Sequence, residues 1–200
     1  MPISLKFKKI RGNLIHSTAV INWKKIKIGK DNIIGPYVVI GNSPQWKNKK
    51  TSGKIEIGNN NTFNEYCNVH LPTSITKITK IGNNNYFMNS TTIDHDCFIE
   101  NYVQLNSNVI LGGNVYVMKN AHLGIKTIVH QNQVIGSYSI TGMGSIITKK
   151  ANIIPGYIYY GKPVKKIKKN FIALKKYKIN EKTLDKEKKR FYKLVKLIKK

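Results

Sequence analysis

A six-residue period runs through most of this 200-residue chain and limits its fold more than any other feature. Stepping by six from Ile57, past Ile75, to Ile153 meets a large apolar residue at every position except Thr141. The same pattern runs between Ile28 and Gly41 in a different register. Because only 40% of the residues are hydrophobic, chance does not produce such a run. The period matches neither a helix, at about 3.6 residues, nor an alternating strand, at about 2.

A second position, four residues after each large one, is mostly small or β-branched. It is occupied by Thr91, Cys97, Val103, Val109, Val115, Ala121, Thr127, Ser139, Ser145 and Ala151. A chain that turns every six residues forms a triangular prism with three hexapeptides per coil. The large residues then stack inside each face, and the small residues fit the crowded corners. Each coil buries its core only against neighbouring coils, about 4.8 Å away, as in solenoids. We therefore predict an all-β solenoid, a parallel β-helix.

The hand of the coil follows from a resemblance. Parallel crossovers are usually right-handed. Repeats of the form Ile/Leu/Val-Gly-x-x-small-x resemble the known exception, the left-handed parallel β-helix. This resemblance implies a left-handed coil over residues 1–163, and a right-handed β-helix or another β-solenoid is the alternative.

Two segments depart from the period. Residues 42–54 contain Trp46 and four lysines, so we expect an excursion loop. Such loops are often functional, and the equal alternative is that Trp46 covers the edge of the prism. Residues 164–200 are Lys-rich and have helical spacing from Phe171 onward, with an apolar stripe. We expect this helical segment to dock on the prism or on a partner subunit; an anionic membrane surface (a peripheral contact) or an acidic carrier protein is the alternative.

The formal charge of +26 raises the question of nucleic acid as a partner. The chain has 33 lysines but only Arg11 and Arg190, whereas phosphate and base readers usually use the arginine fork as well. Half of the net charge lies in residues 164–200, which carry 16 basic and 3 acidic residues. We therefore expect no nucleic-acid partner.

The N-terminal and cysteine patterns indicate the compartment. Residues 1–12 lack the apolar core of a signal peptide, and no stretch approaches the length of a membrane span. The two cysteines, Cys67 and Cys97, cannot form a disulfide framework. They occupy different faces of the prism, and neither C-x-x-C nor H-x-x-x-H spacing occurs, so we expect no metal site. The simplest expectation is a cytoplasmic protein with no permanently bound cofactor.

Residues eighteen apart stack vertically in such a prism, and one column carries chemistry. It contains Lys77, His95, Gly113, Gln131 and Lys149. His95 should lie one coil, about 5 Å, from Gly113. An imidazole can take the proton of an attacking hydroxyl or amine, and a glycine N–H can stabilise the oxyanion of acyl transfer. Histidine titrates near neutral pH, which suits a base.

The other histidines fit this role less well. His130 should lie almost two coils from His95, about 10 Å away, so the two cannot form a hydrogen-bonded pair. His16 and His70 are expected to share a column at another edge, and His122 occupies a further column. A lone histidine is more often structural than catalytic.

Residues 83–169 resemble the hexapeptide acyltransferases related to the UDP-N-acetylglucosamine O-acyltransferase of lipid A synthesis. The segment Ile93-Asp94-His95-Asp96-Cys97 is similar to that family's I-x-H-D-C, which implies His95 as general base and Asp96 as the residue that orients it. Leu111-Gly112-Gly113 matches the oxyanion glycine, and Val129-His130-Gln131 matches a V-H-Q that lines the substrate cleft. Val69-His70-Leu71-Pro72-Thr73 stands where the family has I-H-R-G-T, which places His70 near the acceptor but removes an arginine. Thr92 and Asn114 replace family histidines.

The end of the repeat resembles another branch, the coenzyme A-dependent sugar O- and N-acetyltransferases. The resemblance rests on the segments 145–149, 155–156 and 160–165. It implies a donor-binding set along the pantetheine and nucleotide, made up of Lys149, Gly161, Lys162, Pro163 and Lys165. The alternative is a prism cap that merely turns the chain toward its helix.

Together these patterns predict a homotrimeric acyltransferase that acts on a nucleotide-linked or glycolipid-precursor sugar, with its cleft between subunits. Acyl-coenzyme A is the favoured donor, and acyl-carrier protein is the alternative. A non-catalytic β-solenoid scaffold or a basic surface-binding module is the alternative from another class; neither requires His95 and Gly113 in one column.

Overall fold

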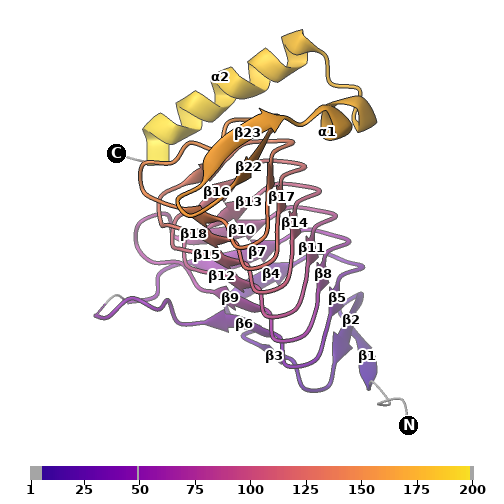
Figure 1. Ribbon diagram of the computed structural model, residues 1–200. Coiled ribbons are helices and arrows are strands. Elements are labelled where there is room, and N and C mark those ends of the chain that lie inside the picture. Colours follow the sequence, from indigo (N-terminus) through magenta and orange to yellow (C-terminus); the bar gives the residue numbers. More distant parts are fainter. Residues whose placement is uncertain (1–5, 49, 199–200) are drawn as a thin grey trace.

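The computed structural model describes residues 6–48 and 50–198 and shows three β-sheets wrapped into a triangular prism (Figure 1). The first face consists of β1 (Phe7–Ile10), β2 (Asn13–His16), β5 (Ile33–Ile34), β8 (Thr62–Phe63), β11 (Tyr86–Phe87), β14 (Gln104–Leu105), β17 (His122–Leu123), β20 (Ile140–Thr141), β22 (Tyr157–Tyr160) and β23 (Lys165–Lys169). The second face consists of β3 (Val20–Ile21), β6 (Val39–Asn42), β9 (Asn68–His70), β12 (Thr92–Ile93), β15 (Ile110–Leu111), β18 (Ile128–Val129) and β21 (Ile146–Ile147). The third face consists of β4 (Ile26–Ile28), β7 (Lys54–Ile57), β10 (Ile78–Ile81), β13 (Phe98–Ile99), β16 (Tyr116–Val117) and β19 (Val134–Ile135).

Parallel pairing from coil to coil sets the register. On the second face Ile93 pairs with Leu111, which pairs with Val129 and then with Ile147, each step being eighteen residues. All four side chains are buried. Thr141, the polar exception, is also buried, and its Oγ1 is hydrogen-bonded to Thr127 Oγ1 at 2.9 Å. The predicted six-residue core is therefore confirmed from β10 onward.

Left-handed backbone conformations form the corners. From Ser90 to Tyr138 a residue with φ near +60° recurs every six residues. Asparagine and aspartate, which tolerate this conformation better than most residues, fill five of these nine positions. The small residue of each hexapeptide follows directly; Cys97, for example, follows Asp96 and is fully buried. The corner positions are therefore packed as the sequence predicts.

Two excursions leave the coils. The first lies between the end of β6 at Asn42 and the start of β7 at Lys54, where an excursion was expected. The second covers residues 71–77, between β9 and β10, and was not foreseen. Ile57 pairs with Ile81, twenty-four residues on, and Ile75, which the period counts as core, is 51% exposed. An insertion of six residues preserves the phase of a six-residue period, so the sequence pattern cannot reveal it.

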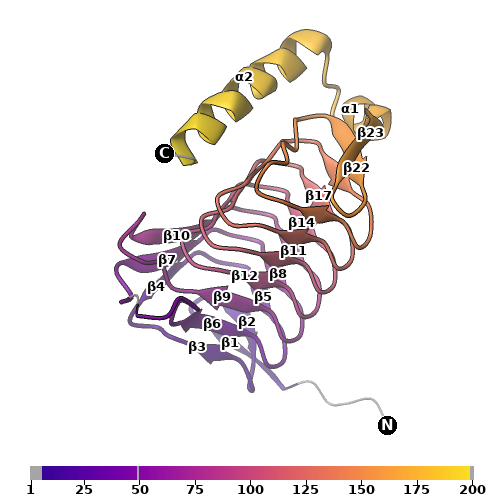
Figure 2. The same ribbon diagram turned by 60° about the vertical axis from the view of Figure 1, so that its left-hand side comes forward.

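The chain after the last coil is more elaborate than the expected single helical segment. β22 and β23 form an antiparallel hairpin, so the Lys-rich run 165–169 is a strand. It is followed by α1 (Phe171–Lys176) and α2 (Glu181–Ile198), which close the C-terminal end of the prism (Figures 1 and 2).

The helix α2 docks on the prism through its apolar side. Phe191 is fully buried against Met118 and Val134, and Glu187 forms an ion pair with Lys119 at 2.9 Å. The apolar stripe of α2 therefore packs against its own chain, with Leu194, Val195 and Ile198 half-buried there. Within residues 6–48 and 50–198 no helix is long and apolar enough to cross a bilayer.

Replacing Leu111 with alanine should lower the free energy of unfolding by about 2–5 kcal/mol, because the side chain is fully buried between two coils. Urea unfolding followed by circular dichroism measures the change. Ile33→Ala, at a 42% exposed strand position, is the control and should cost about 0.5 kcal/mol or less. Equal stability of the Leu111 variant and the wild type would contradict the prism core.

Candidate active site

His95 and Asp96 form a hydrogen-bonded pair at the corner that follows β12. His95 Nδ1 lies 2.8 Å from Asp96 Oδ2. Adjacent residues of an extended strand point to opposite sides, but Asp96 has φ 62°, and this turn brings the two side chains together. His95 is 5% exposed and the Asp96 carboxylate is fully enclosed. The expected orienting contact is therefore present in the structure.

Hydrogen bonds keep the Asp96 carboxylate ionised. Burial alone would raise the pKa of this carboxyl, but hydrogen bonds from His95, Thr73 and Thr76 outweigh burial and hold the pKa well below its ordinary value. An ionised carboxylate only accepts hydrogen bonds, so His95 Nδ1 must be the donor. In the neutral imidazole, the tautomer with its proton on Nδ1 leaves Nε2 of His95 without a proton, as a general base requires.

Gly113 lies directly against the imidazole, as the column predicts. A Cβ at this position would lie 2.3 Å from His95 Cε1 and 2.5 Å from Nε2, so only glycine fits without moving the ring. Among the described residues, none accepts a hydrogen bond from the Gly113 N–H. A candidate base therefore lies against a glycine whose backbone N–H is not hydrogen-bonded to any described residue, which is the minimum for an acyl-transfer site.

His70 supports this pair from the next coil. Its Nδ1 lies 3.0 Å from Asp94 Oδ1, and the same oxygen accepts the His95 backbone N–H at 2.8 Å. Burial alone would raise the pKa of Asp94, but these two hydrogen bonds lower it. His70 is 3% exposed, so it is enclosed beneath the site.

The expected column of His16 and His70 is wrong. His16 ends β2 on the first face, whereas His70 ends β9 on the second. The cause is again insertion, because Ile15 pairs with Ile34 and Ile26 pairs with Ile55, which are 19 and 29 residues apart rather than eighteen.

The first excursion reaches the same site. The Trp46 ring lies 5.4 Å from the His95 imidazole, with 31° between the planes. The second excursion supplies Thr73 and Thr76 to Asp96. The two loops that interrupt the prism therefore meet at the pair formed by His95 and Asp96. The sequence singles out Trp46, whereas it marks Thr73 only as the last residue of the I-H-R-G-T match and gives no signal for Thr76.

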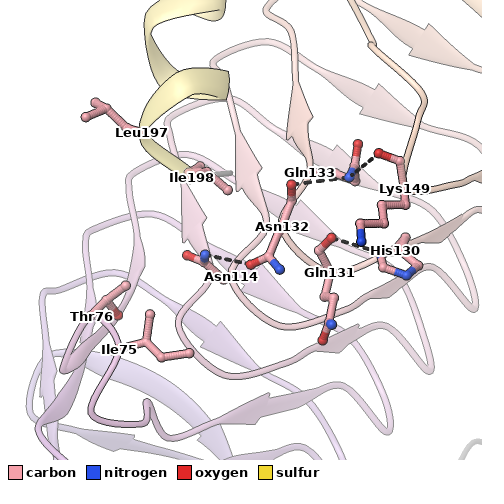
Figure 3. Close-up of a pocket in the computed structure, with 10 residues that line it drawn as sticks. All are labelled: Ile75, Thr76, Asn114, His130, Gln131, Asn132, Gln133, Lys149, Leu197 and Ile198. Atoms are coloured by element: carbon pink, nitrogen blue, oxygen red, sulfur yellow. Dashed lines mark hydrogen bonds between the residues drawn. The ribbon is translucent and has the colours of Figure 1, made fainter. Parts of the chain in front are cut away.

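A cavity of about 1000 Å³ opens further along the same corner (Figure 3). Gln131 and Lys149, which stack above His95 and Gly113, line it together with the exposed His130. Its other lining residues come from the second excursion, from neighbouring corner turns and from the last turn of α2: Ile75, Thr76, Asn114, Asn132, Gln133, Leu197 and Ile198. The cavity mixes amide groups, one cation and an apolar wall, and so suits a long ligand of mixed polarity.

The expected donor-binding residues do not form one cluster. Lys149 follows β21 and lines the cavity. Lys162 lies beside Gly144, which precedes β21, and so belongs to the opposite corner of the second face. Gly161 and Pro163 lie with it in the turn between β22 and β23, and Lys165 begins β23.

The cysteines are packed in the core. Burial raises the pKa of the Cys67 thiol to about 12 and also raises that of Cys97. Cys97 Sγ donates to Gly112 O at 3.3 Å, which ties the His95 corner to the coil that carries Gly113. In the described part of the chain, no three histidine, cysteine, aspartate or glutamate residues gather as metal ligands.

Sequence and fold comparisons give one consistent result. No family model matches the chain. It is 31% identical over 166 residues to the acyl-(acyl-carrier-protein)–UDP-N-acetylglucosamine O-acyltransferase of Gloeothece citriformis, which covers 82% of this chain and 59% of that protein. The protein of the same name from Burkholderia lata is 36% identical over 124 residues, or 61% of this chain and 47% of its own length. The chain thus spans about half the length of the curated relatives it matches.

The similarity extends to the three-dimensional structure. The UDP-N-acetylglucosamine acyltransferase of Bacteroides fragilis superimposes with a TM-score of 0.80 at 27% identity, covering 87% of this chain and 68% of that one. The predicted fold class, a left-handed parallel β-helix, is confirmed.

Replacing Asp96 with asparagine should lower the free energy of unfolding by roughly 2–4 kcal/mol at pH 7, because the lowered carboxyl pKa stabilises the folded state. A depressed acid pKa contributes stability above the unfolded value, near about 4, and loses it as the pH falls further. Urea titrations at pH 7 and below pH 4 should therefore show the difference shrinking in acid. Asp185→Asn, at an exposed ion pair with Lys188, is the control and should change stability by about 0.5 kcal/mol or less at either pH.

Proposed function

Because this chain belongs to the hexapeptide-repeat, left-handed β-helix acyltransferases, we propose that it transfers an acyl group from a thioester carrier to a hydroxyl of a nucleotide-linked sugar. The observation that carries this proposal is the geometry at one corner. His95 is oriented through Nδ1 by an ionised Asp96, and its ring lies against Gly113. A scaffold or a surface-binding module has no need of this arrangement.

The reaction follows from these groups. His95 Nε2 takes the proton of the acceptor hydroxyl as its oxygen attacks the thioester carbonyl carbon. The Gly113 N–H stabilises the oxyanion of the tetrahedral intermediate, and Asp96 stabilises the imidazolium. Collapse of the intermediate breaks the C–S bond, and the leaving thiolate takes the proton from Nε2. Each turnover yields an ester and a free thiol, and the base returns to its starting form.

The proposed acceptor is UDP-N-acetylglucosamine or a close analogue, because the relatives are named for it. Its polar groups find partners in the cavity, where His130 and Gln131 are exposed. Asn114 stands where the family has a histidine, and its Nδ2 donates to Asn132 Oδ1 at 2.8 Å. Neutral amides therefore replace an ionisable group on this wall, which favours hydrogen bonding to hydroxyls and amides of a sugar.

The proposed donor is acyl-carrier protein. The sequence favoured acyl-coenzyme A, but the relatives are named for the carrier protein. The surface supports the same choice. The three acids of residues 164–200 are already engaged: Glu181 by Lys169, Asp185 by Lys188 and Glu187 by Lys119. The exposed lysines of α1 and of the turn after it, Lys175, Lys176 and Lys178, thus form a cationic surface for an acidic protein.

We further propose a cytoplasmic homotrimer, in which neighbouring copies complete the cleft. Apolar side chains on and beside the second face support an interface there: Ile110, Ile128 and Met143 are 44%, 43% and 67% exposed. Cyclic closure is the common way for identical chains to satisfy such a face.

Replacing His95 with alanine should lower kcat by about 10²–10⁴-fold with acyl-carrier protein and UDP-N-acetylglucosamine, because the general base is removed. His16→Ala is the matched control, since this histidine lies on the first face near the N-terminus and should leave kcat unchanged. Thermal unfolding checks that both variants fold. Near-normal turnover by the His95 variant would show that the assigned base is wrong.

Reversing charge at Lys175 and Lys176 should raise the KM for acyl-carrier protein by on the order of 10-fold at low salt and less at high salt, because steering charges act through screened fields. Lys8→Glu with Lys9→Glu, on exposed β1, is the matched control. Charge reversal is cleaner than deletion after Lys169, which would uncover the residues beneath Phe191. An unchanged KM for the carrier protein, with efficient use of acyl-coenzyme A, would reverse the choice of donor.

A further inference from the structure

The second excursion directs two threonine hydroxyls at the carboxylate of Asp96. Thr73 Oγ1 donates to Asp96 Oδ2 at 2.6 Å, and Thr76 Oγ1 donates to Oδ1 at 2.6 Å. The backbone N–H groups of both threonines lie 3.2 Å from the same carboxylate. Hydroxyl-to-carboxylate bonds of this length are strong because the acceptor is charged. The second excursion therefore donates hydrogen bonds to both carboxylate oxygens of Asp96, the residue that orients His95.

These bonds decide which way the carboxylate faces. Oδ2 receives His95 Nδ1 at 2.8 Å and the Thr73 hydroxyl, while Oδ1 is anchored to Thr76 on the far side. If His95 were the only partner of the carboxylate, the carboxylate could rotate about its Cβ–Cγ bond and release Nδ1. With both oxygens held, rotation breaks two strong hydrogen bonds.

The two threonines are not equivalent. Thr73 is fully buried, and its hydroxyl proton has Asp96 as its acceptor among the described residues. The Thr76 hydroxyl lies equally close to a second acceptor, Ile78 O at 2.7 Å, and Thr76 is exposed at the cavity wall. Thr73 is therefore the tighter anchor, and Thr76 stands between Asp96 and a ligand in the cavity.

We propose that Thr73 and Thr76 are positioning residues for the acyl transfer: they lock Asp96 so that His95 keeps its proton on Nδ1 and presents Nε2 as the base. This inference rests on the proposed function and deepens it. The second excursion would then orient the base from outside the coil. Because Thr76 and Ile75 also line the cavity, a bound ligand contacts the same turn that holds the carboxylate.

The test compares Thr73→Val, Thr73→Ser and Thr127→Val in the full-length protein, with acyl-carrier protein and UDP-N-acetylglucosamine. Thr73→Val keeps the shape and removes the hydroxyl, so kcat should fall roughly 10- to 100-fold while both KM values stay within about twofold. Thr73→Ser restores the hydroxyl and should recover kcat to within about threefold. Thr127→Val removes another buried hydroxyl, bonded to Thr141, and should leave kcat unchanged.

Nitrogen-15 NMR of the histidine rings supplies a readout that does not need turnover. The wild type should show His95 protonated at Nδ1, and Thr73→Val should show a mixture of the two tautomers. If the wild type proves inactive with every donor and acceptor tried, the proposed function fails while the NMR comparison still tests the positioning role. Three results would each overturn the inference. Thr73→Val could keep the kcat and the His95 tautomer of the wild type, or Thr73→Ser could fail to recover kcat. Thr127→Val could also lose as much kcat as Thr73→Val.

Should Thr73→Val fail to fold, Thr76→Val is the second variant, since its side chain is exposed. It should lower kcat only modestly relative to the wild type, because the Thr76 hydroxyl is shared with Ile78 O, and it should also raise the KM for UDP-N-acetylglucosamine, whose proposed site is the cavity. Thr76→Ser should restore both. A change in KM with kcat and tautomer intact would make Thr76 a wall of the cavity only and would overturn its positioning role.

Discussion

Stacking of equivalent residues eighteen apart is the constraint on which the rest of the structure depends. The apolar column through Ile93, Leu111 and Val129 holds neighbouring coils in register. A residue two places beyond each of these strands is then forced beside its counterpart on the next coil. His95 meets Gly113 for this reason, and Gln131 and Lys149 continue the same line into the cavity. The candidate site is a consequence of the core, so a slip of register would separate the proposed base, His95, from the proposed oxyanion donor, Gly113.

The limits of sequence reasoning follow from the same constraint. Periodicity places His95 against Gly113 because nothing interrupts the coils between them. It cannot place Thr73, because the excursion at 71–77 lengthens its coil by six residues and so keeps the phase; even the small-residue position continues through Thr73 to Thr79. Pro72 is the one local signal of a break, since a proline cannot donate to the ladder of a central strand. Loop insertions of other lengths, such as the one containing Trp46, disturb the phase and are visible.

The contact between His95 and Asp96 illustrates what local chemistry adds to periodicity. A strand would point the two side chains apart, and only the left-handed turn at Asp96 brings them together. Asparagine fills the corner position before a small residue at 108, 114 and 120, and before Gln133 at 132. Asp96 occupies the same position before Cys97, so the turn was readable from the composition of the corners. The hydrogen bonds from the second excursion were not, because they come from outside the repeat.

The C-terminal segment has two roles, docking on the prism and presenting lysines to solvent, and its net charge alone does not distinguish them. Its apolar residues, Phe191 above all, pack α2 against the third face, so the lysines of the helix face solvent. The last turn of the same helix, through Leu197 and Ile198, also walls the cavity. A carrier protein that binds the cationic surface would therefore contact a segment whose far end borders the acyl-transfer corner. Docking of α2, rather than its net charge, is what connects the proposed donor surface to the candidate site.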